Sequence, residues 1–237
     1  MNTKRIAHIP KSLRPPPKVC RRSEFAKQLF DRVAALIGLI TLSPVFLAVA
    51  VCILLEDGFP VLFRQIRIGR FGRRFVLYKF RSMRTATAGA AVTARGDPRI
   101  TSVGKWIRRY KADELPQLWN VLKGDMSLVG PRPEVPAFVD LRRREWRTVL
   151  QTRPGLTDLA SLTFRNEEDM LAGSADPDQR YKQNILPAKL AMSIEFQQRS
   201  DMRSDLKIIW YTICFSWFPR TPDPKRMRRM FLKSGPE

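Results

Sequence analysis

The chain has 237 residues, which is enough for one domain with appendages. It carries 43 Lys and Arg against 22 Asp and Glu, a formal net charge of +21, and 44% of its residues are hydrophobic. That hydrophobic share excludes wholesale disorder. The positive charge predicts an anionic partner: nucleic acid, an anionic lipid surface, or phosphorylated substrates. Because His8 is the only histidine, we expect catalysis to rest on carboxylates, lysines and arginines.

The N-terminal quarter divides into a tail and an apolar segment. Residues 1–28 are polar, basic and rich in proline, and they predict a basic cytoplasmic tail. Within residues 29–56, the 23 residues from Val33 to Leu55 carry no charge. As a straight helix this run would be about 35 Å long, against a hydrocarbon core of roughly 30 Å. We therefore predict a membrane helix over 29–56, with a buried core helix as the alternative.

Two features of this segment argue against a simple crossing. Ser43 and Pro44 lie near its middle, where proline removes a backbone hydrogen bond and predicts a break in the helix. Lys and Arg near membrane helices are retained on the cytoplasmic side, and a helix that bends at Ser43-Pro44 and returns keeps both basic flanks there. The flanking cations are Lys18, Arg21, Arg22, Lys27 and Arg32 before the run, and Arg64, Arg67, Arg70, Arg73 and Arg74 after it.

Residues 57–218 are expected to form one catalytic domain. Short apolar segments on either side of a glycine-containing turn predict strands near 61–63 and 75–78. Helical patterns follow at 103–110, 115–122 and 138–150. The aromatic stretch 206–218 is too short to span a membrane and predicts a core helix or an interfacial one. Residues 219–237 form a basic C-terminal tail, either solvated or attached electrostatically to anionic lipid.

An adjacent carboxylate pair, Asp113 and Glu114, precedes the predicted helix at 115–122. Asp113 is expected to cap this helix, with Pro116 in its first turn, and to stay ionised near the helix N-terminus. An ionised aspartate can attack phosphorus, and a neighbouring glutamate can hold Mg²⁺ together with substrate phosphates. An ordinary helix cap without catalytic function is the alternative.

Cations that suit phosphate oxygens lie on both sides of the carboxylate pair. Lys79 and Arg81 end a predicted strand, and Arg108 precedes the pair by five residues. Arg132 lies between two prolines, in a turn that is expected to be stiff. Arginine forks and the compact lysine ammonium both bind phosphate. Each cation alone suggests a solvated surface group, whereas the whole set suggests a site that handles phosphate.

The order of these motifs resembles the bacterial sugar transferase family, the monotopic polyprenyl-phosphate phosphoglycosyl transferases. The resemblance extends over residues 27–212 and includes the Ser43-Pro44 break. Several motifs in fixed order make it specific. They are Phe63-Arg64-Gln65 with Arg67 and Gly69, Lys79-Phe80-Arg81-Ser82-Met83, Asp113-Glu114-Leu115-Pro116-Gln117, Asn120-Val121, the run from Gly124 to Pro133, and Arg153-Pro154-Gly155-Leu156-Thr157.

The resemblance implies an α+β protein with a re-entrant membrane helix and a small cytoplasmic domain of short strands and amphipathic helices. It implies that Asp113 attacks the β-phosphate of a UDP-sugar, that UMP leaves, and that the sugar phosphate passes to polyprenyl phosphate. Glu114 is then the Mg²⁺ ligand. Lys79, Arg81, Arg108 and Arg132 are expected to contact phosphates or to organise the site. The implied location is the cytoplasmic face of the bacterial inner membrane, beside anionic lipids.

The chain departs from the family pattern in two regions. Ser82 stands where the family has threonine. The family usually reads Pro-Gly-Ile-Thr-Gly followed shortly by Gln, whereas this chain has Leu156, Thr157 and Asp158 after Pro154-Gly155, with Ser161 near the position of the glutamine. Asp158 replaces a glycine with a side chain and a negative charge, which is expected to change the donor pocket or the local loop geometry and hence the choice of sugar. The motifs specify neither that sugar nor an oligomeric state.

Two other classes of protein are alternatives to the enzyme. A nucleic-acid-binding protein would explain the charge, but its basic residues would be clustered and the apolar run would have no role. We therefore expect no nucleic-acid partner. A catalytically inactive membrane scaffold of the same fold is the second class, because fold does not guarantee activity. The intact Asp113-Glu114 pair favours the enzyme.

Overall fold

The computed structural model describes residues 24–84, 92–218 and 223–232, so most of the predicted N-terminal tail and parts of the predicted C-terminal tail lie outside it. The fold mixes helices and short strands, in agreement with the predicted α+β class. In chain order the elements are α1 (Glu24–Thr41), α2 (Ser43–Asp57), β1 (Leu62–Ile68), β2 (Arg74–Phe80), α3 (Ser102–Arg109), α4 (Gln117–Lys123), β3 (Ser127–Val129), α5 (Arg144–Val149), β4 (Gly155–Thr157), α6 (Leu159–Thr163), α7 (Glu167–Leu171), α8 (Pro177–Arg180), α9 (Leu186–Arg199), α10 (Met202–Trp217) and α11 (Pro224–Phe231).

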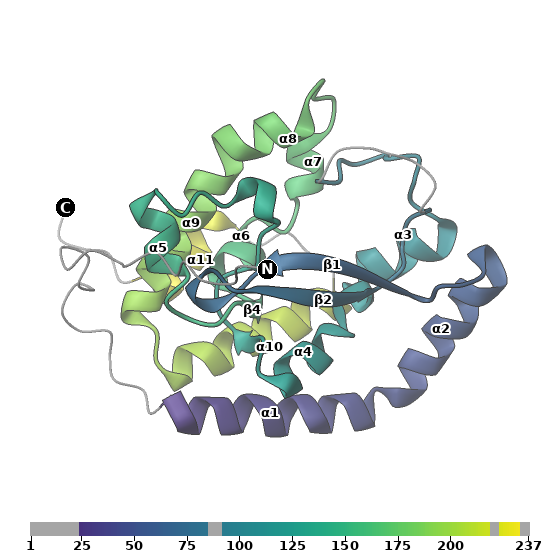
Figure 1. The fold of residues 1–237 in the computed structure, drawn as a ribbon, viewed down its shortest axis with the longest axis horizontal. Coiled ribbons are helices and arrows are strands. Elements are labelled where there is room, and N and C mark those ends of the chain that lie inside the picture. Colours follow the sequence, from purple (N-terminus) through teal and green to yellow (C-terminus); the bar gives the residue numbers. More distant parts are fainter. Residues whose placement is uncertain (1–23, 85–91, 219–222, 233–237) are drawn as a thin grey trace, which may run out of the picture.

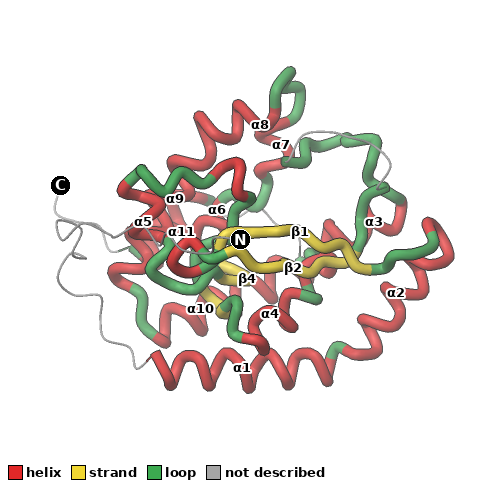
Figure 2. The backbone as a smooth tube through the Cα atoms, in the orientation of Figure 1, coloured by secondary structure: helices red, strands yellow, loops and turns green. Residues whose placement is uncertain are grey.

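The helices surround two small sheets. In Figure 1, α1 runs along one side of the molecule, α2 turns away from it at an angle, and the β1–β2 ribbon crosses the middle. Helices make up most of the backbone, as Figure 2 shows. β1 and β2 are antiparallel, with Phe63 opposite Lys79, whereas β3 and β4 are parallel. Both predicted strands of the ribbon are present and are longer than expected.

The apolar segment forms two helices, α1 and α2, with Leu42 between them, one residue before Ser43-Pro44. Among the described residues no single helix is long and apolar enough to cross a membrane, and α1 with α2 reaches that length only as a pair bent by 59°. Many large apolar side chains on the pair are exposed: Phe25, Leu29, Val33, Leu36, Ile37, Ile40, Val45, Leu47, Val51 and Leu55.

The inner face of α1 is tied to the domain by polar contacts. Lys27 donates to Asp205 of α10 at 2.7 Å, and Ser127 of β3 donates to Asp31 at 2.6 Å. Asp31, Ser127 and Asp205 are all buried. Further along α1, Ala35 joins the main core with residues of α4, β3, α6 and α10. The helix is therefore part of the folded domain and not a separate arm.

β3 and β4 bring together two of the sequence motifs, those at 130–133 and 153–157. Gly155 donates its backbone N–H to the carbonyl of Pro131 at 2.9 Å, and Gly130 donates to the carbonyl of Thr157 at 3.0 Å. A Cβ atom at Gly155 would lie 2.1 Å from the backbone nitrogen of Gly130. No side chain fits between the two segments, so glycine is required for their close approach.

Two predicted segments differ from expectation. The predicted helix at 138–150 is only α5, because Asp140 accepts a backbone N–H from Arg142 and forms a turn before the helix begins. The predicted C-terminal tail contains α11, whose Met227 is buried in the main core. α10 is amphipathic: Ile208 is fully buried whereas Trp210 and Trp217 are exposed. One face of α10 is therefore core, and the other remains available to an interface.

Candidate active site

The carboxylate pair lies in a tight 3₁₀ turn, Ala112–Glu114, between α3 and α4. Both side chains are buried, with exposed fractions of 5% for Asp113 and 9% for Glu114. Lys111 begins the turn in the left-handed conformation at φ 57°, which is costly for a residue with a side chain. The backbone therefore holds the two carboxylates in a fixed, partly strained turn.

The predicted capping role of Asp113 is wrong. The residue at the N-cap of α4 is Pro116, and its side chain makes no capping hydrogen bond. Asp113 lies one turn earlier, and its Oδ1 atom is buried without a hydrogen-bond partner among the described residues. A buried carboxylate oxygen with no donor is costly for folding alone. It is consistent with a group kept free for chemistry.

Glu114 is held by two of the predicted phosphate-binding cations. Arg132 forms a fork on its carboxylate, with Nη2 at 2.5 Å from Oε1 and Nη1 at 3.2 Å from Oε2. Lys79 donates to the same Oε1 at 2.9 Å. Residues far apart in the chain thus meet at one carboxylate. The cluster contains two acidic groups, Asp113 and Glu114, and two basic groups, Lys79 and Arg132, so its formal charges balance.

The α4 helix supplies the support that brings Lys79 to the carboxylates. Asn120, which is fully buried, donates to the carbonyl of Val76 at 2.7 Å and accepts from the N–H of Tyr78 at 3.1 Å. These two bonds extend the free edge of β2. They fix the register of α4 against the strand, so that Lys79 faces the turn that carries Glu114.

The two carboxylates have different electrostatic environments. Burial raises the pKa of Asp113, and the nearby charge of Lys79 opposes this effect only in part. Burial would also raise the pKa of Glu114, but the charges of Arg132 and Lys79 outweigh it and hold that pKa well below its usual range. The pair therefore contains one basic, poorly solvated carboxylate and one firmly ionised carboxylate, as expected where two carboxylates have different roles.

The other two predicted cations have structural partners. Arg81, which is buried, donates to the carbonyls of Asp57 and Gly58 at 2.8 and 2.5 Å and so closes the end of α2. Arg108 pairs with Glu168 of α7 and donates to Ser82 at 3.4 Å. The site therefore brings together Lys79 and Arg132, whereas Arg81 binds elsewhere and Arg108 is held by another carboxylate.

The carboxylate pair fits a divalent cation of the Mg²⁺ type. Such a cation takes one or two carboxylates from the protein and completes its shell with water and substrate phosphates. Asp113 and Glu114 would supply these oxygens. Oδ1 of Asp113 has no partner among the described residues and suits a cation or an electrophilic phosphorus atom, whereas both oxygens of Glu114 already accept from Arg132 or Lys79. In the part of the chain that the structure describes, no cluster of three or more His, Cys, Asp and Glu forms a complete protein cage.

The model of the bacterial sugar transferase family matches residues 22–218, which include every residue of this site. The chain belongs to the bacterial sugar transferase family. The chain is similar to an undecaprenyl-phosphate glucose phosphotransferase of Komagataeibacter xylinus, at 36% identity over 82% of this chain and 36% of that protein. It is also similar to the UDP-glucose:undecaprenyl-phosphate glucose-1-phosphate transferase of Caulobacter vibrioides, at 39% identity over 80% of this chain and 69% of that protein.

A third bacterial sugar transferase, from Aeromonas hydrophila, is 48% identical over 58% of this chain. Its name describes an N-acetylgalactosaminephosphotransferase acting on undecaprenyl phosphate. The match covers 34% of that protein, so this chain spans about a third of the length of two of these three relatives. Two of the three relatives have glucose in their names and the third has N-acetylgalactosamine, whereas undecaprenyl phosphate is common to all.

Asp158, the departure from the family glycine, has a structural partner on each side. One oxygen accepts the backbone N–H of Ser161 at 2.6 Å and caps α6, and the other accepts the hydroxyl of Ser193 in α9 at 2.7 Å. Asp158 is 2% exposed. The added carboxylate is therefore used inside this bacterial sugar transferase, where it joins two helices and does not project into an open pocket.

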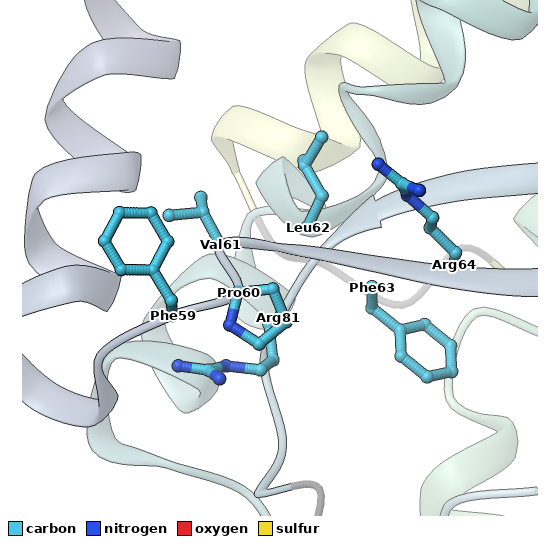
Figure 3. A pocket seen from close by; sticks show the side chains of 7 residues that line it. All are labelled: Phe59, Pro60, Val61, Leu62, Phe63, Arg64 and Arg81. Atoms are coloured by element: carbon cyan, nitrogen blue, oxygen red, sulfur yellow. The ribbon is translucent and has the colours of Figure 1, made fainter.

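An apolar depression of about 590 Å³ lies at the start of β1, near the end of α2 (Figure 3). In the register of the ribbon, Phe63 of its wall is opposite Lys79, and paired residues of an antiparallel ladder point to the same face. Phe59 is 83% exposed. The lining residues are Phe59, Pro60, Val61, Leu62, Phe63, Arg64 and Arg81.

Sequence reasoning missed a set of buried polar residues next to Arg132. Glu134, Tyr181 and Lys189 are each less than 9% exposed. Tyr181 and Lys189 belong to the helical region from 177 to 199, which is remote in the chain from every motif quoted above. The only signal in the sequence was Glu134, which directly follows the Arg132-Pro133 turn.

Proposed function

We propose that this bacterial sugar transferase moves a sugar-1-phosphate from a UDP-sugar to undecaprenyl phosphate, with release of UMP. One observation carries the proposal: the buried Asp113-Glu114 pair, held among Lys79 and Arg132. The names of the relatives, each with undecaprenyl phosphate as the acceptor, support the class of reaction. Such a reaction begins the assembly of exopolysaccharides and other glycoconjugates.

The first half of the proposed reaction is an attack by Asp113. A carboxylate oxygen forms a bond to the β-phosphorus of the UDP-sugar, the bond from that phosphorus to the bridging oxygen breaks, and UMP leaves with the electron pair. Burial and the unpartnered Oδ1 atom favour Asp113 as the nucleophile, because a poorly solvated carboxylate is more basic. Glu114 is too firmly engaged by Arg132 and Lys79 to have this role.

In the second half, an oxygen of the acceptor phosphate attacks the same phosphorus and releases Asp113. The cations Lys79 and Arg132 are suited to the negative charge of the transferred phosphoryl group. Mg²⁺, bound by Glu114 and the substrate phosphates, would neutralise charge on the diphosphate. The chain's own contribution is to orient the two carboxylates and to hold the cations in place before substrate arrives.

We also propose that α1 and α2 form the re-entrant membrane segment, at the cytoplasmic face of the inner membrane of a bacterium. The support is the bend of 59°, the exposed apolar side chains on both helices, and the basic residues on both flanks. In this arrangement the exposed Trp210 and Trp217 of α10 suit the headgroup region. The basic residues would attract anionic lipids.

The covalent mechanism predicts UMP release without an acceptor. Mixing the enzyme, Mg²⁺ and the correct UDP-sugar should release at most about one UMP per active site and leave a sugar phosphate on the protein. A panel of UDP-sugars identifies the donor, and intact-protein mass spectrometry detects the adduct. Direct attack by the lipid phosphate would instead give neither UMP nor adduct until lipid is added, with full turnover afterwards.

The apolar depression beside Lys79 is the proposed binding place for the prenyl chain next to the acceptor phosphate. Phe63→Ser should raise the KM for undecaprenyl phosphate about tenfold, since contact with a Phe side chain is worth about 1.5–3 kcal/mol. The acceptor-free release of UMP should stay unchanged. Phe71→Ser removes another exposed ring, which lies outside the depression, and is the control. Equal effects of the two variants, or a lost UMP burst in Phe63→Ser, would contradict this placement.

A further inference from the structure

A chain of buried polar contacts runs from the Arg132 turn into the helical part of the domain. The hydroxyl of Tyr181 donates to Oε1 of Glu134 at 2.5 Å. Lys189 of α9 donates to the Tyr181 hydroxyl at 3.2 Å and to Oε2 of Glu167 at 2.7 Å. Buried charges are costly unless they are paired and hydrogen-bonded. In this series of contacts the charged groups of Glu134, Lys189 and Glu167 are all hydrogen-bonded.

The direction of the bonds is fixed by the charges. Burial and the nearby Glu134 carboxylate raise the pKa of Tyr181, so its hydroxyl keeps its proton and donates it to Glu134. The Lys189 ammonium then donates to the remaining lone pair of that hydroxyl. The Tyr181 ring packs against Phe138 with 5.3 Å between ring centroids. The tyrosine is thus held both by its ring and by its hydroxyl.

At one end, this series of contacts reaches the turn that presents Arg132. The backbone of the turn is held on its other sides as well. The carbonyl of Pro131 accepts from Gly155, the carbonyl of Pro133 accepts from Arg67 at 3.1 Å, and the carbonyl of Glu134 accepts from Ile68 at 3.0 Å. Those contacts fix the main chain. The Glu134 carboxylate also lies 3.8 Å from Arg67 of β1, and among the described contacts it is the bond from Tyr181 that ties this side chain to α9 and its flanking helices.

We propose that Tyr181 and Lys189 are positioning residues for the transfer reaction. Through Glu134 they hold the turn at 131–134 so that the Arg132 fork meets Glu114 and the phosphates of the donor. The inference rests on the proposed function, because Arg132 has a catalytic task only if the site transfers a phosphoryl group. Neither residue touches the carboxylate pair in the described contacts. Their effect on the reaction therefore passes through Arg132.

The test is a double-mutant cycle between Tyr181→Phe and Arg132→Lys. Tyr181→Phe keeps the ring and its packing but removes the donor to Glu134. We expect kcat to fall about 10- to 100-fold, because small displacements of a positioned group have effects of this size. In the Arg132→Lys background the same change should have almost no further effect. Tyr211→Phe, whose hydroxyl contacts only the sulfur of Met230 at 3.7 Å among the described contacts, is the matched control.

A structural role alone would give a different pattern. If Tyr181→Phe lowers kcat by the same factor in both backgrounds, or does not lower it at all, the positioning role is wrong. Binding of UDP, measured by calorimetry on the full chain, gives a second cycle that needs no turnover. If the wild-type protein transfers no sugar phosphate, the proposed function is wrong. The UDP cycle still tests the positioning role in that case, because additive losses of UDP affinity in Tyr181→Phe and Arg132→Lys would overturn it.

A second substitution serves as the control for a folding defect in Tyr181→Phe. Glu134→Gln keeps the length of the side chain and an oxygen that accepts from Tyr181, and its thermal unfolding is followed beside that of Tyr181→Phe. If Tyr181→Phe does not fold, Glu134→Gln takes its place in the cycle. Its expected loss of kcat is smaller, about fivefold to tenfold, because the bond from Tyr181 becomes a neutral one. Additivity with Arg132→Lys would again overturn the proposal.

Discussion

Asp113→Asn is expected to abolish both the acceptor-free release of UMP and the sugar-phosphate adduct. The amide has nearly the shape of the carboxylate but is a far weaker nucleophile. The loss of an essential nucleophile typically lowers turnover by about 10⁴- to 10⁶-fold. Because burial opposes the charge of Asp113, the neutral variant should fold at least as well as the wild type. Loss of activity with unchanged or raised Tm would therefore separate chemistry from folding.

The measurement is UMP release in the presence and absence of undecaprenyl phosphate, followed by intact-protein mass spectrometry. Asp125→Asn is the matched control, since Asp125 lies in the same region and pairs only with Lys123 among the described ion pairs. It should leave both half-reactions intact. An adduct that persists in Asp113→Asn would remove Asp113 from the nucleophile role and point to another group.

Arg132→Lys is expected to lower turnover about 10²- to 10³-fold, the usual effect of losing one donor at a centre that develops charge. Lysine keeps the charge but lacks the planar fork that contacts both oxygens of Glu114. The free energy of unfolding should change much less than the activation free energy, because Lys79 still pairs with Glu114. Steady-state kinetics with saturating donor and acceptor measures the effect.

Arg226→Lys makes the same replacement on the exposed face of α11 and should leave turnover unchanged. If Arg132→Lys retained near-normal turnover, the fork on Glu114 would be a structural ion pair and not part of the reaction. The positioning role of Tyr181 would then lose its target as well. The two experiments are therefore linked, and Arg132→Lys should be measured first.

The local features of this protein could be predicted from the sequence. The strands of the ribbon follow from short apolar runs on either side of a glycine-containing turn, and their extra length comes from pairing, which no single strand specifies. The aromatic stretch 206–218 predicted a core or interfacial helix, and α10 is one, but it begins earlier, after an Asp201–Ser204 capping box, and it has one buried and one exposed face. The family resemblance was confirmed by the match over residues 22–218.

The individual roles of the cations could not be predicted. Lys79 and Arg81 are two residues apart and look equivalent in the sequence, yet one contacts Glu114 and the other closes the end of α2. On a strand, this difference depends on the packing of α2 and α4, which is a tertiary property. The same holds for Asp113, whose burial in a 3₁₀ turn opposed the ionisation that a helix cap would have favoured.

The polar contacts of α1 make the apolar segment inseparable from the enzyme. Removing α1 would take away Asp31, which accepts from Ser127, and Lys27, which donates to Asp205; Ser127 and Asp205 are each 2% exposed. The loss of each of these hydrogen bonds should destabilise the domain by about 0.5–1.5 kcal/mol, and by more where a charged group is involved. Ser127 begins β3, the strand that leads directly into the Arg132 turn. A shortened chain made for solubility would thus lose part of the framework of the Arg132 turn, and detergent or nanodisc preparations of the whole chain are the appropriate material for enzymology.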